Sequence, residues 1–214
     1  MLRTLSISAA LALWLGSSVH AKELVYGTWV PESGPTGAAL RDFFDRVAKD
    51  TDNELTFRAQ FDGQIVNIRT VLPGLRDQLI DAGYVAGSFF PAEWRADFMF
   101  TDETSIPSDT RALAGAFAET ILLDCPQCKE ESEQSGAVVL GYLTDAPYYL
   151  QCANPFGPLS DLTGKQIRSV NAFQEMAKAF GGVPVATTPA ETYEAMQRGA
   201  VECYLVCRLL LEKK

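Results

Sequence analysis

Apolar residues in the first third of the chain alternate between the period of a strand and the period of a helix. Residues 23–30 and 54–60 are rich in aromatic, β-branched and alternating apolar side chains, which is typical of strands. A third strand is predicted at residues 80–86. Between these strands, apolar side chains recur at the i, i+3, i+4 and i+7 spacing of helices that pack on a sheet: Leu40, Phe43, Phe44 and Val47, then Ile68, Val71, Leu72, Leu75 and Leu79, with Pro73 as a local breaker. This β-α-β-α-β order predicts a mainly parallel sheet.

The middle of the chain changes from helix to strand. A helix is predicted at residues 108–123, capped by Ser108 or Asp109. Strands are predicted at residues 137–143 and 148–153, joined by a turn at residues 144–147. We expect these two strands to carry the chain from one lobe to the next, where a hinge would lie.

Two later helices are marked by their first residues. Asn171 can cap a helix that begins at Ala172, and Thr188-Pro189-Ala190-Glu191 is a capping box with proline at the first helical position. The strand after the second helix, at residues 200–206, resembles residues 79–85, because each follows a helix and has an acidic residue near its start. This internal echo suggests two lobes built alike with a ligand between them, although ordinary α/β patterning is the competing interpretation.

The N-terminus has the features of a secretory signal at residues 1–21: Arg3, an apolar segment at residues 7–15 and Ala21 at the cleavage site. No later apolar run approaches the roughly 20 residues of a membrane span. We therefore expect a periplasmic protein that does not itself span the membrane. Its expected organisation is a signal peptide at residues 1–21, a first α/β lobe at 22–146, and a crossing strand with a partial second α/β lobe at 147–214.

Charge and histidine content exclude several classes of function. The chain has 18 basic and 27 acidic residues, a formal net charge of −9, so nucleic acid is not an expected partner. Its one histidine, His20, lies within the signal. The mature chain therefore lacks the residue on which Ser-His-Asp and Cys-His nucleophiles and imidazole metal sites depend. We expect neither an enzyme, nor a metal site, nor a cofactor.

Five cysteines remain in a chain that is expected to be exported. Cys125 and Cys128 form a C-x-x-C motif, which can be a redox dithiol, half of a metal site or a local disulfide. Redox motifs normally open a helix directly after a strand, whereas this one follows a predicted helix. A zinc site would need Cys152 and a carboxylate as well. We favour a structural disulfide, either Cys125–Cys128 or one of these with Cys152. Cys203 and Cys207 lie too close to the chain end to interpret.

An arginine at the end of a short strand is the main candidate for a ligand-binding residue. Residues 161–164 have turn chemistry and residues 165–168 form a brief extended run, so Arg168 is placed just before a helix N-terminus. A guanidinium there presents a planar set of donors that fits a carboxylate bidentately, and free backbone N–H groups favour the same charge. The favoured ligand is an organic anion, and a surface arginine in a solvated ion pair is the competing interpretation.

The sequence after Arg168 favours the ligand site. Three segments follow one another: Gly164-Lys-Gln-Ile-Arg168, then Gly181-Gly182-Val-Pro-Val185, then Pro189-Ala-Glu191-Thr-Tyr193-Glu-Ala-Met-Gln-Arg-Gly199-Ala-Val-Glu202. Their order resembles the solute-binding proteins of TRAP transporters, the DctP family. The resemblance implies a two-lobed α/β fold like that of type II periplasmic binding proteins. It also implies an organic acid ligand held by a salt bridge to Arg168, and delivery of that ligand to TRAP membrane permease subunits.

Two departures from the family pattern refine this expectation. Many members carry a second basic ligand residue on the crossing strand, where this chain has Tyr148-Tyr149-Leu150-Gln151. This difference favours a monocarboxylate, or a ligand with hydroxyl or apolar bulk, over a C4-dicarboxylate. The chain also stops at Lys214, whereas complete members continue with further helices. We therefore expect a C-terminally truncated form with an incomplete second lobe.

Candidate ligand contacts are the residues at strand ends that would face the ligand. In the first lobe they are Trp29, Ser33, Gly87, Ser88 and Phe89, and in the second lobe Arg168. Tyr148 and Tyr149 of the crossing strand are expected to line the floor of the site. For each aromatic residue, core packing is the competing interpretation. Two other functions stay open, a ligand-sensing module that signals to a receptor and a thiol-disulfide protein that uses Cys125 and Cys128.

Overall fold

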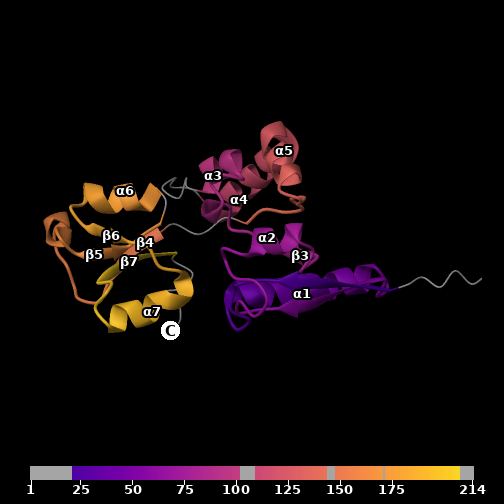
Figure 1. Cartoon of the computed structure of the whole chain (residues 1–214), viewed down its shortest axis with the longest axis horizontal. Helices are drawn as coiled ribbons and strands as arrows, with labels where there is room; N and C mark the ends of the chain where they lie inside the picture. Colours follow the sequence, from indigo (N-terminus) through magenta and orange to yellow (C-terminus); the bar gives the residue numbers. More distant parts are fainter. Residues whose placement is uncertain (1–20, 102–108, 144–147, 171, 208–214) are drawn as a thin grey trace, which may run out of the picture.

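The computed structural model describes residues 21–101, 109–143, 148–170 and 172–207. The described strands form two separate sheets, one of three strands and one of four. Figure 1 shows the two sheets, each with its own helices, as two bodies beside each other. No helix of the described residues is long and apolar enough to cross a bilayer.

The first sheet is parallel and has the order β2-β1-β3. Its strands are β1 (Lys22–Gly27), β2 (Leu55–Gln60) and β3 (Ala82–Gly83), connected by the helices α1 (Pro35–Asp50) and α2 (Val71–Arg76). The predicted β-α-β-α-β order is confirmed. β3 is shorter than predicted because only two of its residues pair with β1. Pro73 does not delay α2, since it stands in the first turn, where a backbone N–H would have no helical partner.

Aromatic side chains join α1 to this sheet. Phe44 of α1 is buried against Tyr26 of β1, with ring centroids 4.9 Å apart, and against Phe57 of β2 at 4.7 Å. Phe43, the neighbouring position of the predicted stripe, is 49% exposed. The helix therefore buries a narrower face than its sequence predicts. A second core cluster lies around α2 and β3: Val66, Val71, Leu72, Ile80, Phe90 and Trp94.

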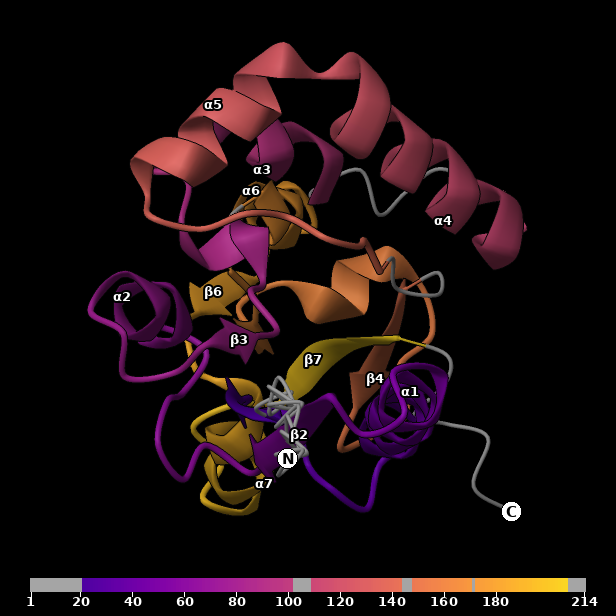
Figure 2. The same cartoon turned by 90° about the vertical axis from the view of Figure 1, so that its right-hand side faces the viewer.

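A group of helices follows the first sheet. It comprises α3 (Arg95–Thr101), α4 (Thr110–Glu119), a π-helical turn (Thr120–Asp124) and α5 (Pro126–Gln134). Figure 2 shows α4 and α5 as an arch above the rest of the molecule. The predicted cap of α4 is confirmed for Asp109, whose carboxylate accepts the N–H groups of Arg111 and Ala112 at 2.9 and 3.1 Å. Ser108 lies outside the described residues.

The predicted strand at residues 137–143 is wrong, because this segment pairs with no strand among the described residues. The period-two pattern that suggested a strand is nevertheless visible in its packing. Ala137 and Val139 pack against the core around α2, whereas Val138 and Leu140 are 71% and 89% exposed. Alternating burial alone cannot produce a strand without a neighbouring strand to pair with. The predicted turn at residues 144–147, and with it the predicted lobe boundary, lies outside the described residues.

The second sheet has the order β4-β7-β5-β6. β4 (Tyr148–Cys152) runs antiparallel to β7 (Cys203–Cys207), whereas β5 (Gln166–Arg168) is parallel to β7 and to β6 (Val183–Val185). Figure 1 shows α6 (Ala172–Ala179) and α7 (Pro189–Gln197) on opposite sides of this sheet. The predicted capping box at the start of α7 is confirmed. The predicted cap Asn171 lies outside the described residues.

The echo between the lobes is confirmed by the hydrogen bonds of the two acidic residues. The Asp81 N–H donates to the Val25 carbonyl at 2.9 Å, and the Asp81 carboxylate accepts the Val25 N–H at 2.8 Å. Glu202 makes the same pair of contacts with Gln166, at 2.8 and 3.1 Å. In both lobes an acidic residue thus joins the last strand to the first strand of a β-α-β-α-β unit. By this correspondence Arg168, which ends β5, is equivalent to Gly27, which ends β1.

Two disulfides are present among the described residues. Cys125–Cys128 is one of the pairings predicted from the sequence. The alternative pairing of Cys152 with Cys125 or Cys128 is wrong, because Cys152 of β4 is bonded to Cys203 of β7. The two residues lie directly opposite each other in the antiparallel ladder. That ladder joins residues 51 positions apart in sequence, which a local motif cannot reveal.

Candidate ligand-binding site

Arg168 is held by the main chain of the segment after β6. Its Nε and Nη2 atoms both donate to the Thr187 carbonyl, at 3.1 and 2.9 Å. These two bonds use one edge of the planar guanidinium. The other edge, formed by Nη1 and the second Nη2 hydrogen, has the spacing of a bidentate carboxylate contact. Thr187 therefore fixes the plane of the guanidinium and leaves one bidentate edge open to an anion.

The charge of Arg168 has no carboxylate partner within 4.0 Å in the part of the chain that the structure describes. The residue is half-buried. Burial lowers the pKa of the guanidinium from its usual value, and the nearby Tyr148 acts in the opposite direction. Because arginine stays protonated in proteins, the site keeps a partly desolvated positive charge. An anionic ligand would compensate that charge.

The two candidate tyrosines of β4 lie on opposite faces of the strand. Tyr148 is half-buried, close to Arg168, and its ring packs on Phe173 of α6 with centroids 5.1 Å apart. Tyr149 is 45% exposed, and its side chain points to the other face of the strand. The structure thus brings Tyr148 to the arginine and places Tyr149 away from it.

In the first lobe, the candidate residues lie in the segments that follow β1 and β3. Trp29 stacks on Tyr84 with ring centroids 5.5 Å apart, and its indole N–H donates to the Tyr84 carbonyl at 3.2 Å. Gly87, Ser88 and Phe89 form a single 3₁₀ turn shortly after β3. Ser33 is exposed in the loop before α1. Tyr84 was not predicted, although it follows β3 by one residue and the strand-end rule that selected Gly87 applies to it as well.

An arginine of the first lobe lies over one of these residues. The Arg69 guanidinium lies 5.3 Å from the centroid of the Phe89 ring. Glu191, in the first turn of α7, has a lowered pKa because it accepts hydrogen bonds from the backbone and side chain of Thr188, with a smaller contribution from the charge of Arg69. The charge of Arg69 thus acts on the start of α7, next to the segment that holds Arg168, without an ion pair between Arg69 and Glu191 among the described residues. The sequence has no local signal that marks Arg69.

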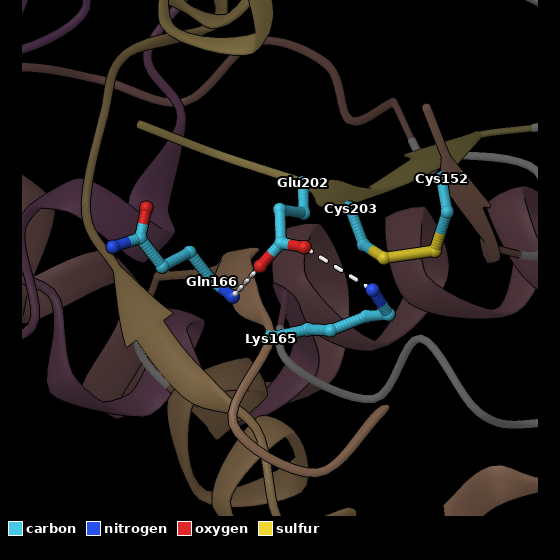
Figure 3. A network of polar contacts seen from close by, with 5 residues as sticks. All are labelled: Cys152, Lys165, Gln166, Glu202 and Cys203. Carbon is cyan, nitrogen blue, oxygen red and sulfur yellow. Dashed lines mark hydrogen bonds and ion pairs between the residues drawn. A yellow bond between two sulfur atoms is a disulfide. The ribbon is translucent and has the colours of Figure 1, made fainter. Parts of the chain in front are cut away.

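The strand that ends in Arg168 is fixed at its other end by a polar network. Figure 3 shows the Glu202 carboxylate between the Gln166 N–H and the Lys165 ammonium, beside the Cys152–Cys203 disulfide. Both contacts are 3.1 Å long, and donation from Gln166 and then from Lys165 holds the pKa of Glu202 below its usual value. β5 is only three residues long. The network therefore supports the position of the arginine two residues further on.

Two hollows on the surface of the described residues are not lined by the candidate ligand contacts. One, of about 140 Å³, lies between α2 and α5, and the other, of about 160 Å³, lies beside Cys128. Among the described residues no group of three or more histidine, cysteine, aspartate or glutamate side chains is placed to hold a metal ion. The candidate site is therefore defined by its charge and its aromatic side chains.

A family model described as bacterial extracellular solute-binding protein, family 7 (DctP), matches residues 26–205. A search of curated protein sequences returned no match.

Solved structures of TRAP solute-binding proteins have a similar fold. A marine metagenome protein specific for aromatic acid ligands, in complex with 3-hydroxybenzoate, has a TM-score of 0.77 at 15% identity, over 86% of this chain and 57% of that one. A Bordetella pertussis receptor that binds pyroglutamic acid has a TM-score of 0.74 at 20% identity, over 87% and 60%. A Bordetella bronchiseptica protein with bound mandelate has a TM-score of 0.73 at 22% identity, over 86% and 58%. This chain thus spans less than two thirds of the length of each.

Proposed function

Because the chain belongs to bacterial extracellular solute-binding protein family 7, the DctP family, we propose that it binds a small organic acid and delivers it to a TRAP membrane permease. The observation that carries this proposal is Arg168. Its guanidinium is partly desolvated, fixed in its plane by Thr187, and has no carboxylate partner among the described residues. A protein would not gain stability from a cation placed in this way, since burial without a partner is costly. A ligand anion gives the arrangement a function.

The ligand carboxylate takes the edge of the guanidinium that Thr187 leaves open. Two parallel charge-assisted hydrogen bonds form there, each contributing about 1.5–3 kcal/mol. Movement of one lobe toward the other brings Phe89 and Trp29 of the first lobe to the ligand. Binding selects the closed arrangement because only that arrangement has contacts from both lobes.

The body of the ligand is apolar or aromatic, with a single carboxylate. Tyr148 and Phe173 lie next to Arg168 and offer aromatic surface instead of a second cation. Two of the structurally similar proteins hold aromatic acids, 3-hydroxybenzoate in one and mandelate in the other. Aromatic monocarboxylates are therefore the first ligands to test.

The remaining parts of the proposal concern location and partners. The signal features at residues 1–21 direct the chain to the periplasm, where the membrane subunits of the transporter receive the loaded protein. The protein acts by binding and release and carries out no chemical step.

A thermal-shift screen of carboxylates tests this function. The panel contains 3-hydroxybenzoate, mandelate, pyroglutamate and galacturonate, with the corresponding uncharged amides of the first two as controls. A ligand at about 100 times its dissociation constant stabilises the protein by about 2.7 kcal/mol. Arg168→Ala should abolish the shift, whereas Arg46→Ala, which removes an exposed arginine of α1, should retain it. If no carboxylate shifts the wild-type protein, or if the amides shift it equally, the proposal is wrong.

A second candidate function, thiol-disulfide exchange, is favoured by the position of Cys125. It is the N-cap of α5, and its sulfur accepts the Cys128 N–H at 3.1 Å. A helix N-terminus lowers the pKa of a cysteine thiol, which makes the reduced form more stable and the disulfide easier to open. A structural role explains Cys125–Cys128 less well than it explains Cys152–Cys203. The first closes a loop of only a few residues and should stabilise the folded protein by about 2 kcal/mol, whereas the second joins residues 51 positions apart and should stabilise it by about 4 kcal/mol.

Thiol labelling during graded reduction with dithiothreitol tests this second candidate. It expects Cys125–Cys128 to open at a reductant concentration at least tenfold lower than Cys152–Cys203 does, under native conditions. Opening of both disulfides over the same concentration range would remove it.

A further inference from the structure

Thr187 holds Arg168 through its carbonyl, but its own hydroxyl has no partner. The Oγ1 atom is buried and neither donates nor accepts a hydrogen bond among the described residues. Three other hydroxyls of this region all have partners. Ser169 donates to the Ile167 carbonyl at 3.1 Å, Thr188 to the Glu191 carboxylate at 2.8 Å, and Thr192 to the Thr188 carbonyl at 3.0 Å. The unpartnered hydroxyl thus belongs to the residue that touches the candidate ligand-binding cation.

An unpartnered buried hydroxyl costs free energy in the ligand-free protein. A valine of nearly the same shape would avoid that cost, because desolvating a polar group without a new hydrogen bond is unfavourable. The carbonyl that fixes Arg168 belongs to the main chain and does not require a threonine. Neither the fold nor the position of the guanidinium therefore explains the hydroxyl.

We propose that the Thr187 hydroxyl is a ligand-binding group that donates a hydrogen bond to the carboxylate held by Arg168. This inference rests on the proposed function of the site. Thr187 lies in the irregular segment between β6 and α7, not in a helix, so more than one staggered χ1 rotamer is open to it. Turning from one to another breaks no hydrogen bond. The residue as a whole is only half-buried and its carbonyl contacts the guanidinium, so its side chain lies at the border of the candidate site.

The ligand site then consists of the Arg168 guanidinium and the Thr187 hydroxyl, and the Thr187 carbonyl links the two residues. Arg168 supplies the charge and the bidentate geometry, and Thr187 both fixes the guanidinium and adds a third donor. A third donor satisfies a further lone pair of the carboxylate, which a single arginine edge leaves open. Sulfonates and phosphonates, with three acceptor oxygens, would also fit this set of donors, so their binding is a further readout.

The test is Thr187→Val, measured in two ways on the same protein. The variant should bind the tightest carboxylate of the panel at least tenfold more weakly than wild type in isothermal titration calorimetry, since hydrogen bonds to charged groups are strong. The ligand-free variant should melt about 2–4 °C higher than wild type, because a buried polar group without a partner has been removed. Weaker binding together with higher stability is a combination that a structural hydroxyl does not produce.

Two further variants serve as controls. Thr187→Ser keeps the hydroxyl and should bind within threefold of wild type. Thr51→Val removes a hydroxyl that donates to the Val47 carbonyl at 2.8 Å in the first lobe, so it should lower the melting temperature and leave binding unchanged.

Binding of the Thr187→Val variant within twofold of wild type overturns the inference, and so does a lower melting temperature of its ligand-free form. If wild type itself binds no carboxylate, the proposed function fails. The melting temperature then still decides whether the Thr187 hydroxyl lacks a partner.

Discussion

The stability of the helical group should depend on pH through one buried carboxyl group, Asp97 of α3. Asp97 is only 6% exposed. Burial, and to a smaller degree the charge of Glu131 on α5, raises its pKa from 3.8 to about 6. A raised folded-state pKa means that the contribution of the group to stability is fully present below pH 3.8 and is lost as the pH rises through about 6. Raising the pKa from 3.8 to about 6 corresponds to about 3 kcal/mol.

Asp97→Asn removes this titration. The variant should therefore become more stable relative to wild type as the pH rises, with the advantage close to zero near pH 4 and approaching about 3 kcal/mol near pH 7.5. Urea unfolding of both proteins at several pH values measures the difference, in which the titration of groups that do not interact with Asp97 cancels. Glu131→Gln should reduce the pH dependence of the wild-type protein in part, because it removes the smaller of the two causes.

A difference between Asp97→Asn and wild type that stays constant from pH 4 to pH 7.5 would refute the assignment of this titration to Asp97. A wild-type protein that gains stability relative to the variant as the pH rises would refute even its sign.

Two further predictions concern the first lobe. Gly37→Ala should lower the free energy of unfolding by about 1–3 kcal/mol in urea titrations, because a Cβ there would lie 2.4 Å from the Glu32 carbonyl oxygen. Gly115→Ala in helix α4, where a Cβ would meet nothing within 4 Å, should raise the free energy of unfolding by about 0.5–1 kcal/mol. Equal effects of the two substitutions would contradict the close approach at Gly37. Ligand binding should change the fluorescence of Trp29, which stacks on Tyr84, so Trp29→Phe should lose the signal and Trp94→Phe should keep it, and the reverse pattern would remove Trp29 from the site.

Local patterns in the sequence are sufficient for much of the fold. The helix α1, the cap Asp109 and the capping box at Glu191 depend on residues within one or two turns of each other, and each is present in the structure, although Phe43 of the α1 stripe is exposed. The echo between residues 79–85 and 200–206 predicted two similar lobes for the same reason, since it compares two short segments. Arg168 also follows from local information, because a turn, a short strand and a helix start define its place.

Features that depend on distant segments were not predictable in this way. Residues 137–143 have the alternation of a strand, but whether a strand forms depends on a neighbour that the pattern does not contain. The pairing of Cys152 with Cys203 depends on the antiparallel ladder between β4 and β7. The role of Thr187 depends on a contact with Arg168, which lies 19 positions away in sequence.

The most direct test of the carboxylate site is calorimetric titration of Arg168→Lys with the tightest-binding acid of the panel. Lysine keeps the positive charge but has no planar pair of donors, and it cannot hold the Thr187 carbonyl and a bidentate carboxylate at the same time. Loss of at least one charge-assisted hydrogen bond of about 1.5–3 kcal/mol should weaken binding at least tenfold, nearly as much as Arg168→Ala does. Binding by Arg168→Lys within twofold of wild type would show that charge alone suffices and would contradict the bidentate site.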